Sequence, residues 1–214
     1  VLVLTAGLMG TGKSVLARAL APRLGAEVIR TDVLRKELLN IQPAERRSDA
    51  FGQGIYSDEI TRLTYDRALE IAGKALEKGR SAIIDASYKR QADRMQAAEM
   101  AKKLNADFFL VECICREDRI KERLNARQAD NSEPSDGRWE LFIAQKADFD
   151  PVTEVPAASH LVIDTEQDPD SCMEEVLDRI RGFDGERLSR WSKSVADQRG
   201  KFKSPSLARD LPSV

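Results

Sequence analysis

The sequence predicts an α/β fold built on a parallel sheet. Short segments that are apolar along almost their whole length, such as Val1–Leu4 and Phe108–Ile114, alternate with longer segments whose apolar residues recur at helical spacing. Continuously apolar strands are typical of a parallel sheet that is buried on both faces, and the helices between the strands cover it. We therefore expect five parallel strands with helices on both faces, and a ligand site outside the carboxyl ends of the strands.

The first predicted strand leads into a glycine-rich segment, and an amphipathic helix follows. Residues 7–14 have the sequence Gly-Leu-Met-Gly-Thr-Gly-Lys-Ser. Glycines let the backbone curl until successive N–H groups point inward, and the N-terminus of the following helix adds the positive end of its dipole. This order is that of a phosphate-binding P-loop, in which Lys13 reaches the β- and γ-phosphates and the Ser14 hydroxyl ligates Mg²⁺. The predicted nucleotide-binding residues are Gly7, Gly10, Thr11, Gly12, Lys13 and Ser14.

The remaining elements continue the alternation. The P-loop helix should end near Gly25, and a second strand over residues 26–29 leads to Asp32. Apolar residues at helical spacing predict a long helix over residues 58–78, with Gly79 at its end. The other expected segments are a helix over 33–39, a polar connection over 41–56, a strand over 81–85, a helix over 90–104, a strand over 108–114, a basic helix over 117–128, a polar loop over 129–137, a helix over 139–149, a strand over 160–163 and a helix over 171–180.

An acidic residue follows or ends each of two predicted strands. Asp32 follows the strand over 26–29, and one helical turn places Arg35 on the same side. A helix N-cap with a salt bridge would account for this pair. At the end of a strand beside a P-loop, however, Asp32 can accept the proton of a substrate hydroxyl while Arg35 holds a substrate oxyanion. Asp85 closes an apolar strand, as a Walker B acid that holds Mg²⁺ directly or through water does; a turn aspartate is the alternative.

The polar residues after Asp85 leave two interpretations open. Ser87, Tyr88 and Arg94 follow this acid in the sequence. They would either line an acceptor pocket or cap the next helix.

A stripe of arginines on the basic helix is a candidate lid. Arginines recur there at three- and four-residue steps, interrupted by acids, at Arg116, Arg119, Arg123 and Arg127. Such a stripe is usually a solvated face. Phosphoryl transfer, however, needs cations over the γ-phosphate and exclusion of water, and guanidinium groups serve this better than ammonium groups. We therefore predict an arginine-bearing lid with Arg123 and Arg127 as its functional residues.

Composition and charge narrow the class of protein. The 214 residues are 42% hydrophobic with a net charge of -2, which indicates one enzyme domain and no nonspecific binding to DNA or anionic membranes. No apolar run approaches the roughly 20 residues that span a bilayer, so the expected location is cytoplasmic. Cys113, Cys115 and Cys172 are interpreted as buried thiols, not as a disulfide framework or zinc site. His160 is the single histidine, which leaves little basis for a histidine triad.

The predicted domain organisation is a P-loop domain over residues 1–182 and a helical or flexible extension over residues 183–214. Ser, Lys, Arg, Pro and Gly accumulate in the extension, where Trp191 and Phe202 are the expected anchors. The chain begins directly in a predicted strand at Val1, which suggests that it is part of a longer protein.

Together these motifs resemble the P-loop kinase group that includes gluconate kinase, adenylylsulfate kinase, the phage polynucleotide 5′-hydroxyl kinase and the zeta toxins. The similarity runs from Val1 to about Thr165 and is nearest to ATP-binding kinase domains joined to an aminoglycoside-phosphotransferase-like domain. The matching residues are Gly7 to Ser14, Thr31-Asp32 with Arg35, Phe51-Gly52 with Ile55-Tyr56, Asp85-Ala86-Ser87-Tyr88 with Arg94, and Cys115 with Arg123 and Arg127. Thr31 departs from a common serine and Ser87 from a usual threonine in this group.

The resemblance implies transfer of the γ-phosphate of ATP, with Mg²⁺, to an acceptor hydroxyl. Asp32 would be the base, Arg35 the acceptor clamp, and a lid arginine would hold the phosphate together with Lys13. The acceptor would be a small molecule or a nucleic-acid 5′-end, and a fused aminoglycoside-phosphotransferase-like domain is an expected partner, with no membrane partner. The main alternative is an ATP-binding regulatory or sensor domain with slow hydrolysis. A toxin that acts on a nucleotide sugar and a motor ATPase are further alternatives.

Overall fold

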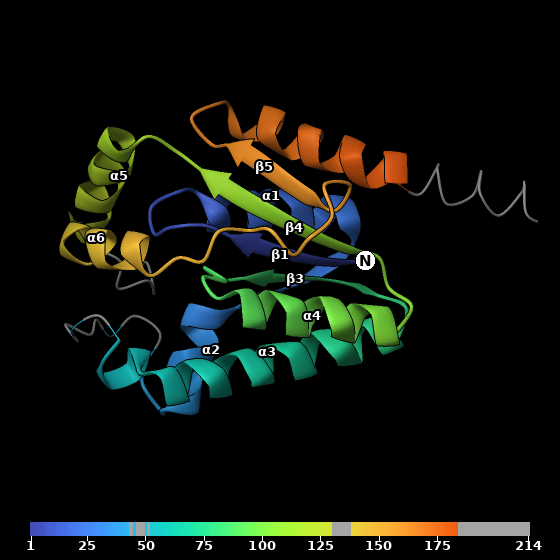
Figure 1. Cartoon of the computed structure of the whole chain (residues 1–214), viewed down its shortest axis with the longest axis horizontal. Coiled ribbons are helices and arrows are strands. Elements are labelled where there is room, and N and C mark those ends of the chain that lie inside the picture. Colours follow the sequence, from blue (N-terminus) through green and yellow to red (C-terminus); the bar gives the residue numbers. More distant parts are fainter. Residues whose placement is uncertain (43–44, 46–49, 51, 130–137, 184–214) are drawn as a thin grey trace, which may run out of the picture. The chain divides into compact units, whose positions relative to one another are not determined.

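The fold is an α/β fold around one parallel sheet (Figure 1). The computed structural model describes residues 1–42, 45, 50, 52–129 and 138–183, without the side chains of residues 127–129. The strands are β1 (Leu2–Ala6), β2 (Ala26–Arg30), β3 (Ser81–Asp85), β4 (Phe108–Ile114) and β5 (His160–Asp164). They form a five-stranded sheet in the order β2-β3-β1-β4-β5, and every pairing is parallel. The predicted sheet is confirmed.

The helices also follow the predicted order. They are α1 (Lys13–Leu24), α2 (Thr31–Leu38), α3 (Asp58–Glu77), α4 (Gln91–Lys103), α5 (Glu117–Ala129) and α6 (Trp139–Ala147), with a short 3-10 helix η1 (Gly54–Tyr56) and a last helix over residues 169–183. One boundary bears on the site, because α2 begins at Thr31 and not at residue 33. Asp32 therefore lies in the first turn of a helix that starts directly at the end of β2.

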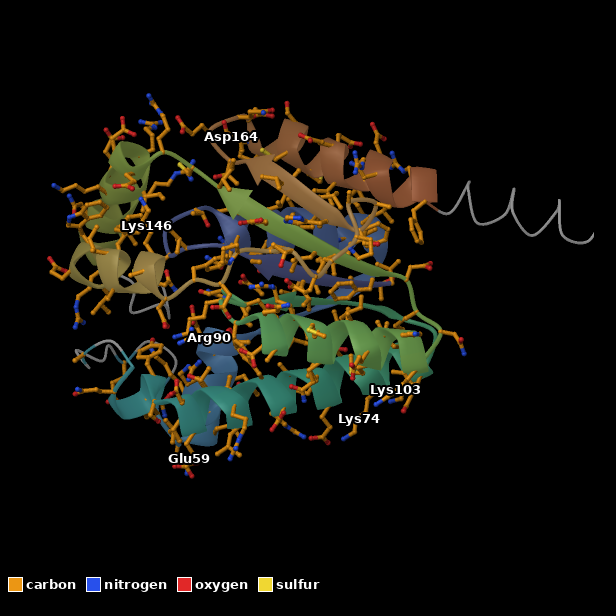
Figure 2. All side chains as sticks on the ribbon, viewed as in Figure 1. Glu59, Lys74, Arg90, Lys103, Lys146 and Asp164 are labelled. Carbon is orange, nitrogen blue, oxygen red and sulfur yellow. The ribbon has the colours of Figure 1, made fainter. Side chains whose placement is uncertain are left out.

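Helices cover both faces of the sheet. Side chains alternate along β1, so Leu2 and Leu4 point to one face and Val3 points to the other. Leu2 and Leu4 belong to a buried cluster that includes Ala68 and Ala72 of α3, whose small side chains let the helix lie close to the strands. Helix α1 packs on the opposite face against β1, β2 and β3 (Figure 1). Charged side chains such as those of α3 point away from the core (Figure 2).

The strand order brings the two predicted acids to one edge of the sheet. Strand β3 lies between β1 and β2, and Arg30 at the end of β2 is paired in register with Asp85 at the end of β3. The prediction that the strand before Asp32 lies beside the P-loop strand is wrong, because β3 separates β2 from β1. The carboxyl ends of β1, β3 and β2 nevertheless face the same side, because all three strands run parallel.

The chain divides into two compact units, residues 1–177 and 178–214. The division between these units lies within the last helix. The predicted domain boundary after residue 182 stays a prediction. Most of the predicted extension, residues 184–214, lies outside the described residues. No helix in the described part of the chain is long and apolar enough to cross a membrane.

A buried arginine braces the turn that follows β3. Arg94 is 0% exposed, and its Nε donates to Glu154 Oε1 at 2.5 Å. Its other nitrogens donate to the carbonyl oxygens of Tyr88 at 2.9 Å and Pro151 at 3.1 Å. Tyr88 has a φ of 40°, a left-handed conformation that is strained for a bulky residue. Arg94 therefore has a structural role, because it holds this strained turn in place.

Removing Arg94 is expected to destabilise the fold strongly. Arg94→Met leaves the Glu154 carboxylate, 7% exposed, without its cation. Breaking a buried ion pair from one side costs about 3 kcal/mol or more. Urea denaturation followed by circular dichroism measures this loss in the free energy of unfolding. As a control, Glu99→Ala at an exposed position of α4 should change that free energy by less than about 0.5 kcal/mol.

The same ion pair should give a characteristic pH dependence. Burial raises the pKa of Glu154, but the hydrogen bonds from Arg94 and from the backbone outweigh this, and the net pKa is lowered. The pair therefore stabilises the fold at neutral pH, and its contribution is lost as the pH falls below the ordinary range of glutamate toward the lowered native pKa. The stability difference between wild type and Arg94→Met should shrink in acid. A constant difference from neutral to acid pH would contradict this account.

Candidate functional site

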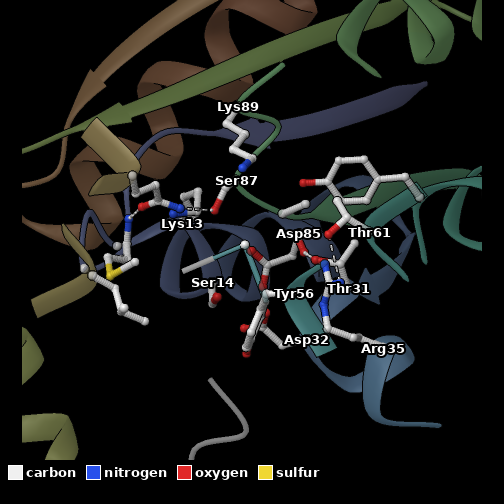
Figure 3. A pocket seen from close by; sticks show the side chains of 18 of the residues that line it. Lys13, Ser14, Thr31, Asp32, Arg35, Tyr56, Thr61, Asp85, Ser87 and Lys89 are labelled. Carbon is white, nitrogen blue, oxygen red and sulfur yellow. Dashed lines mark hydrogen bonds between the residues drawn. The ribbon is translucent and has the colours of Figure 1, made fainter. Parts of the chain in front are cut away.

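A pocket opens at the carboxyl ends of β1, β3 and β2 (Figure 3). The start of α1, the first turn of α2 and the residues after β3 meet there, and η1, α3 and α6 complete the wall. Of the predicted site residues, the lining contains Gly10, Gly12, Lys13, Ser14, Asp32, Arg35 and Asp85. Gly7, Thr11 and Arg123 lie outside this lining. The structure thus brings the loop and both strand-end acids to one space.

The glycine loop packs closely against the ends of neighbouring strands. Gly7 has a φ of 122°, and its N–H donates to the carbonyl oxygen of Ser87 at 3.1 Å. A Cβ atom at Gly7 would lie 2.4 Å from the carbonyl oxygen of Cys113, at the end of β4. Gly12, at the N-cap of α1, also has a left-handed φ of 89°. Only glycine suits Gly7, because any side chain would collide with the backbone of β4.

Side chains of the loop fold it onto itself. The Thr11 hydroxyl and the Lys13 ammonium each donate to the carbonyl oxygen of Leu8, both at 2.7 Å. Helix α1 begins at Lys13, so the positive end of its dipole lies at the glycine loop, where it favours a bound anion. Lys13 and Ser14 both line the pocket (Figure 3). The Lys13 ammonium, which can bind phosphate, and the Ser14 hydroxyl, which can bind a cation, thus lie beside a helix N-terminus.

Asp85 is buried at the end of β3 and held from two sides. Its Oδ1 accepts from the Thr5 hydroxyl at 3.4 Å, and its Oδ2 lies 3.7 Å from Arg30 Nε. Thr31 Oγ1 donates to its backbone carbonyl at 3.0 Å. These contacts orient a carboxylate in the pocket, where it could hold a cation. Sequence reasoning identified Asp85 but missed Thr5 and Arg30, because their proximity follows from the strand order.

Asp32 lies in the same pocket on the first turn of α2. Burial raises the pKa of its carboxyl group, and the negative charge of Asp85 raises it further. The positive charges of Arg35, Arg30 and Lys13 act in the opposite direction without reversing the shift. A carboxylate whose pKa is raised is a better proton acceptor than an ordinary aspartate, provided that it is ionised.

Arg35 is buried and ties α2 to the segment before α3. Its Nη1 donates to the Ile55 carbonyl at 2.8 Å and to Thr61 Oγ1 at 3.1 Å, and its guanidinium carbon lies 5.0 Å from the centre of the Tyr56 ring. Its Nε is buried without a hydrogen-bond partner among the described residues. The guanidinium group is thus already oriented beside the pocket. The predicted role of Arg35 as an acceptor clamp stays a prediction.

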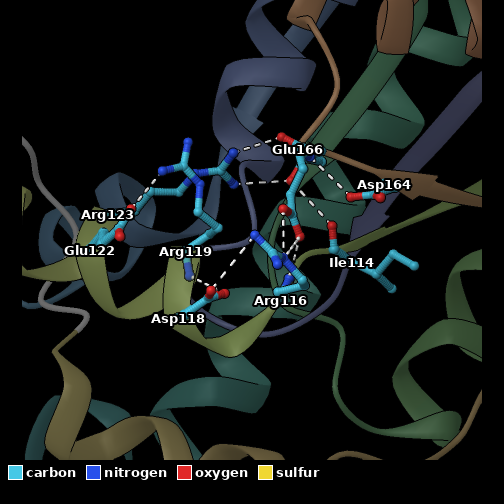
Figure 4. Close-up of polar contacts among 9 residues, drawn as sticks. Ile114, Arg116, Asp118, Arg119, Glu122, Arg123, Asp164 and Glu166 are labelled. Carbon is cyan, nitrogen blue, oxygen red and sulfur yellow. Dashed lines mark hydrogen bonds and ion pairs between the residues drawn. The ribbon is translucent and has the colours of Figure 1, made fainter.

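Of the two predicted lid arginines, Arg123 does not line the pocket in this structure. Arg123 donates to Thr165 Oγ1 at 3.0 Å and to the Thr165 carbonyl at 2.6 Å, and it lies 3.5 Å from the Gly10 carbonyl. Arg116 instead contacts Glu166, and Arg119 contacts Glu122 of its own helix (Figure 4). Arg127 belongs to α5 by its backbone, and its side chain lies outside the described residues. Arg123 therefore braces the outer side of the glycine loop.

The polar residues after Asp85 separate into two groups. Ser87 lines the pocket, whereas Tyr88 and Arg94 do not and belong to the buried network behind it. Gln145 of α6 also lines the pocket and hydrogen-bonds to the glycine loop, and sequence reasoning missed it. No local motif marks a glutamine in the middle of an ordinary helix, so no sequence signal could have identified it.

The glycine loop and both strand-end acids lie within a stretch that matches a known protein family. Residues 2–152 match a family model described as "AAA domain", which covers more than half of the chain. The chain belongs to this family. Among curated proteins it is 31% identical over 149 residues to the uncharacterized protein Rv2004c of Mycobacterium tuberculosis (strain ATCC 25618 / H37Rv), over 70% of this chain and 30% of that protein. This AAA domain chain therefore spans less than a third of the length of that relative.

Solved structures of kinases share the fold of this AAA domain chain. A sugar kinase from Janibacter sp. HTCC2649 has a TM-score of 0.64 at 21% identity, over 84% of this chain and 94% of that chain. A gluconokinase from Sinorhizobium meliloti 1021 has a TM-score of 0.55 at 20% identity, over 92% and 95%. The Mycobacterium tuberculosis APS kinase CysC, in complex with AMPPNP and APS, has a TM-score of 0.57 at 20% identity, over 84% and 96%. These similarities confirm the P-loop NTPase fold that the sequence predicts.

Gly7→Ala is expected to destabilise the protein by more than about 1 kcal/mol, because the new methyl group meets the Cys113 carbonyl and the residue must keep a positive φ. Gly73→Ala in α3 is the matched control. Its Cβ would lie 3.6 Å from Met100 Sδ, an ordinary contact, and alanine favours a helix interior by up to about 1 kcal/mol over glycine. Urea denaturation of both variants measures the difference. Equal stabilities would contradict the packing described for Gly7.

Proposed function

We propose that this chain is a kinase that transfers the γ-phosphate of ATP to a hydroxyl group. The observation that carries the proposal is the shared pocket, in which Lys13 and Ser14 of the P-loop lie with Asp85, Asp32 and Arg35. Phosphoryl transfer requires bound phosphates, neutralised charge and a residue that orients the nucleophile. The pocket contains a group suited to each requirement.

The residues beside the P-loop fit a magnesium nucleotide. The Ser14 hydroxyl and the Asp85 carboxylate offer oxygen ligands, and Mg²⁺ usually takes one or two protein oxygens with phosphates and water as the others. Among the described residues, no group of three or more His, Cys, Asp or Glu side chains could hold a metal ion. With only one or two protein oxygens on offer, the ion would bind together with the nucleotide, whose phosphates supply further ligands. Bound there, Mg²⁺ would neutralise phosphate charge.

The proposed chemistry uses Asp32 and Arg35 on the acceptor side of the pocket. The acceptor oxygen forms a bond to the γ-phosphorus while the bond from that phosphorus to the bridging oxygen of ADP breaks, and ADP leaves. Asp32 accepts the proton of the acceptor hydroxyl and later returns it to solvent. Arg35 orients the acceptor through its guanidinium group. Because the transition state is loose, positioning and charge neutralisation contribute more than the base does.

A small hydroxylated molecule fits the acceptor side better than the alternatives. Tyr56, Thr61 and Tyr65 line this part of the pocket beside Arg35. The three residues carry hydroxyl groups and Arg35 a guanidinium group, which are hydrogen-bond donors suited to an oxygen-rich acceptor. Two of the structural neighbours are named as a sugar kinase and a gluconokinase, which supports the same class of acceptor. A nucleic-acid 5′-end is the second acceptor to be tested.

Three finer features complete the proposal. Arg123 and Arg127 would act from the α5 side as lid residues, which requires Arg123 to exchange its contacts with Thr165 for the transferred phosphate. The protein would act in the cytoplasm. A domain resembling aminoglycoside phosphotransferases would be joined to this one, in keeping with a relative of which this chain matches only 30%.

The rival function is an ATP-binding sensor domain that hydrolyses slowly and acts through a joined domain. The partial coverage of the longer relative favours it. Release of ADP, measured over a panel of sugars, nucleosides, antibiotics and 5′-hydroxyl oligonucleotides, separates the two. Stimulation by one class of acceptor supports the kinase, whereas slow turnover that no acceptor changes supports the sensor.

Two substitutions in the pocket should have different effects. Lys13→Ala should abolish phosphoryl transfer, because it removes the cation that reaches the phosphates. Asp32→Asn should lower kcat by about 100-fold, the lower range for loss of a general base, and leave ATP binding largely unchanged. Kinetics with the identified acceptor and calorimetry with ATP measure the two effects. Lys103→Ala, at an exposed site on α4, is the control. Transfer by Asp32→Asn at the wild-type rate would refute the role of this aspartate.

A further inference from the structure

A glutamine of α6 joins two parts of the candidate site. Gln145 is 7% exposed, and its Oε1 accepts from the Met9 N–H of the glycine loop at 2.6 Å. Its Nε2 donates to Ser87 Oγ at 3.2 Å, just beyond Asp85 at the end of β3. The orientation of the amide follows from chemistry, because a backbone N–H can only donate and must face the oxygen. Both the oxygen and the nitrogen of the Gln145 amide are therefore hydrogen-bonded.

The same helix also packs against the glycine loop through apolar contacts. Phe142 of α6 is fully buried with Ile120 and Leu124 of α5, and Leu8 and Met9 of the loop pack against this cluster. The loop is thus attached to α6 by one hydrogen bond and by a hydrophobic contact next to it. A change in the loop conformation must either move α6 or break both attachments.

The start of α6 carries an intrinsic reporter of such a movement. The Trp139 ring stacks on Phe142 with 4.8 Å between ring centres, and Lys121 Nζ of α5 lies 5.3 Å from the centre of the Trp139 ring. Both contacts link the indole to the α5–α6 contact that holds the loop. Trp191, the other tryptophan of the chain, lies outside the described residues and is replaced so that the measured fluorescence comes from Trp139 alone.

We propose that Gln145 is a positioning residue that couples occupancy of the glycine loop to the placement of α6. The inference rests on the proposed function, because it requires that the loop binds the phosphates of a nucleotide. Phosphate binding uses the inward N–H groups of the loop, and the Met9 N–H is held by Gln145. Adjustment of the loop to phosphates shifts Gln145 and Phe142, and with them Trp139. By thermodynamic linkage, the position of α6 in turn influences nucleotide affinity.

The test measures Trp139 fluorescence in a Trp191→Phe background during titration with AMPPNP and Mg²⁺. Calorimetry on the same samples measures binding independently. The background protein should show a saturable fluorescence change with the affinity found by calorimetry. Gln145→Met, which keeps the length of the side chain and removes the amide, should lose most of that change, because only the apolar contact between the loop and α6 remains. Its affinity should fall by no more than about tenfold, the upper end of the effect of losing the one neutral hydrogen bond that Gln145 makes to the loop.

Two further variants make the test decisive. Glu140→Gln changes an exposed residue of the same helix and should retain the full fluorescence change. Ser87→Ala removes only the second partner of Gln145 and should reduce the change, so it replaces Gln145→Met if that variant does not fold. A full change in Gln145→Met or Ser87→Ala would overturn the inference, as would binding by the background protein without any change. Absence of calorimetric binding in the background protein would instead overturn the proposed function, and the inference with it.

Discussion

The position of the glycine loop depends on hydrogen bonds from segments that are far apart in the sequence. Ser87 after β3 accepts from the Gly7 N–H, Gln145 of α6 accepts from the next part of the loop, and Thr165 after β5 donates to the Thr11 carbonyl at 2.7 Å. A buried loop with unpaired backbone groups would be costly, so these partners stabilise one conformation. The pocket exists because the sheet brings all of these segments to its carboxyl edge.

Acidic and basic side chains lie next to each other at the carboxyl edge of the sheet. Asp85 lies beside Arg30 of the neighbouring strand, and Asp32 lies one helical turn before Arg35. Burial and the charge of Asp85 both raise the pKa of Asp32, so the two carboxylates destabilise each other when both are ionised. The neighbouring guanidinium groups offset part of this repulsion. A divalent cation held at Asp85 would offset more of it.

The sequence predicted what local patterns encode. Continuous apolar strands gave the parallel sheet, and the spacing of glycines before Lys13 gave the loop. It could not give the strand order, because placing β3 between β1 and β2 is decided by packing between distant segments. The same limit hid the burial of Arg94, whose partner Glu154 lies 60 residues away, and the contact of Arg123 with Thr165. Residues with a local motif were found, and residues that act through tertiary contacts were not.

Helix α6 contributes side chains both to the candidate pocket and to a second cavity, and helical geometry explains which side chain faces which cavity. Leu141 and Gln145 line the candidate pocket, while Phe142 and Lys146 line a second cavity on the other side of the glycine loop. Residues four apart share one face of a helix, so each pair faces one cavity. On the far face Lys146 pairs with Glu117 of α5, and on the near face Gln145 holds the loop. Because both faces are engaged, α6 cannot move relative to the loop without also changing its contacts with α5.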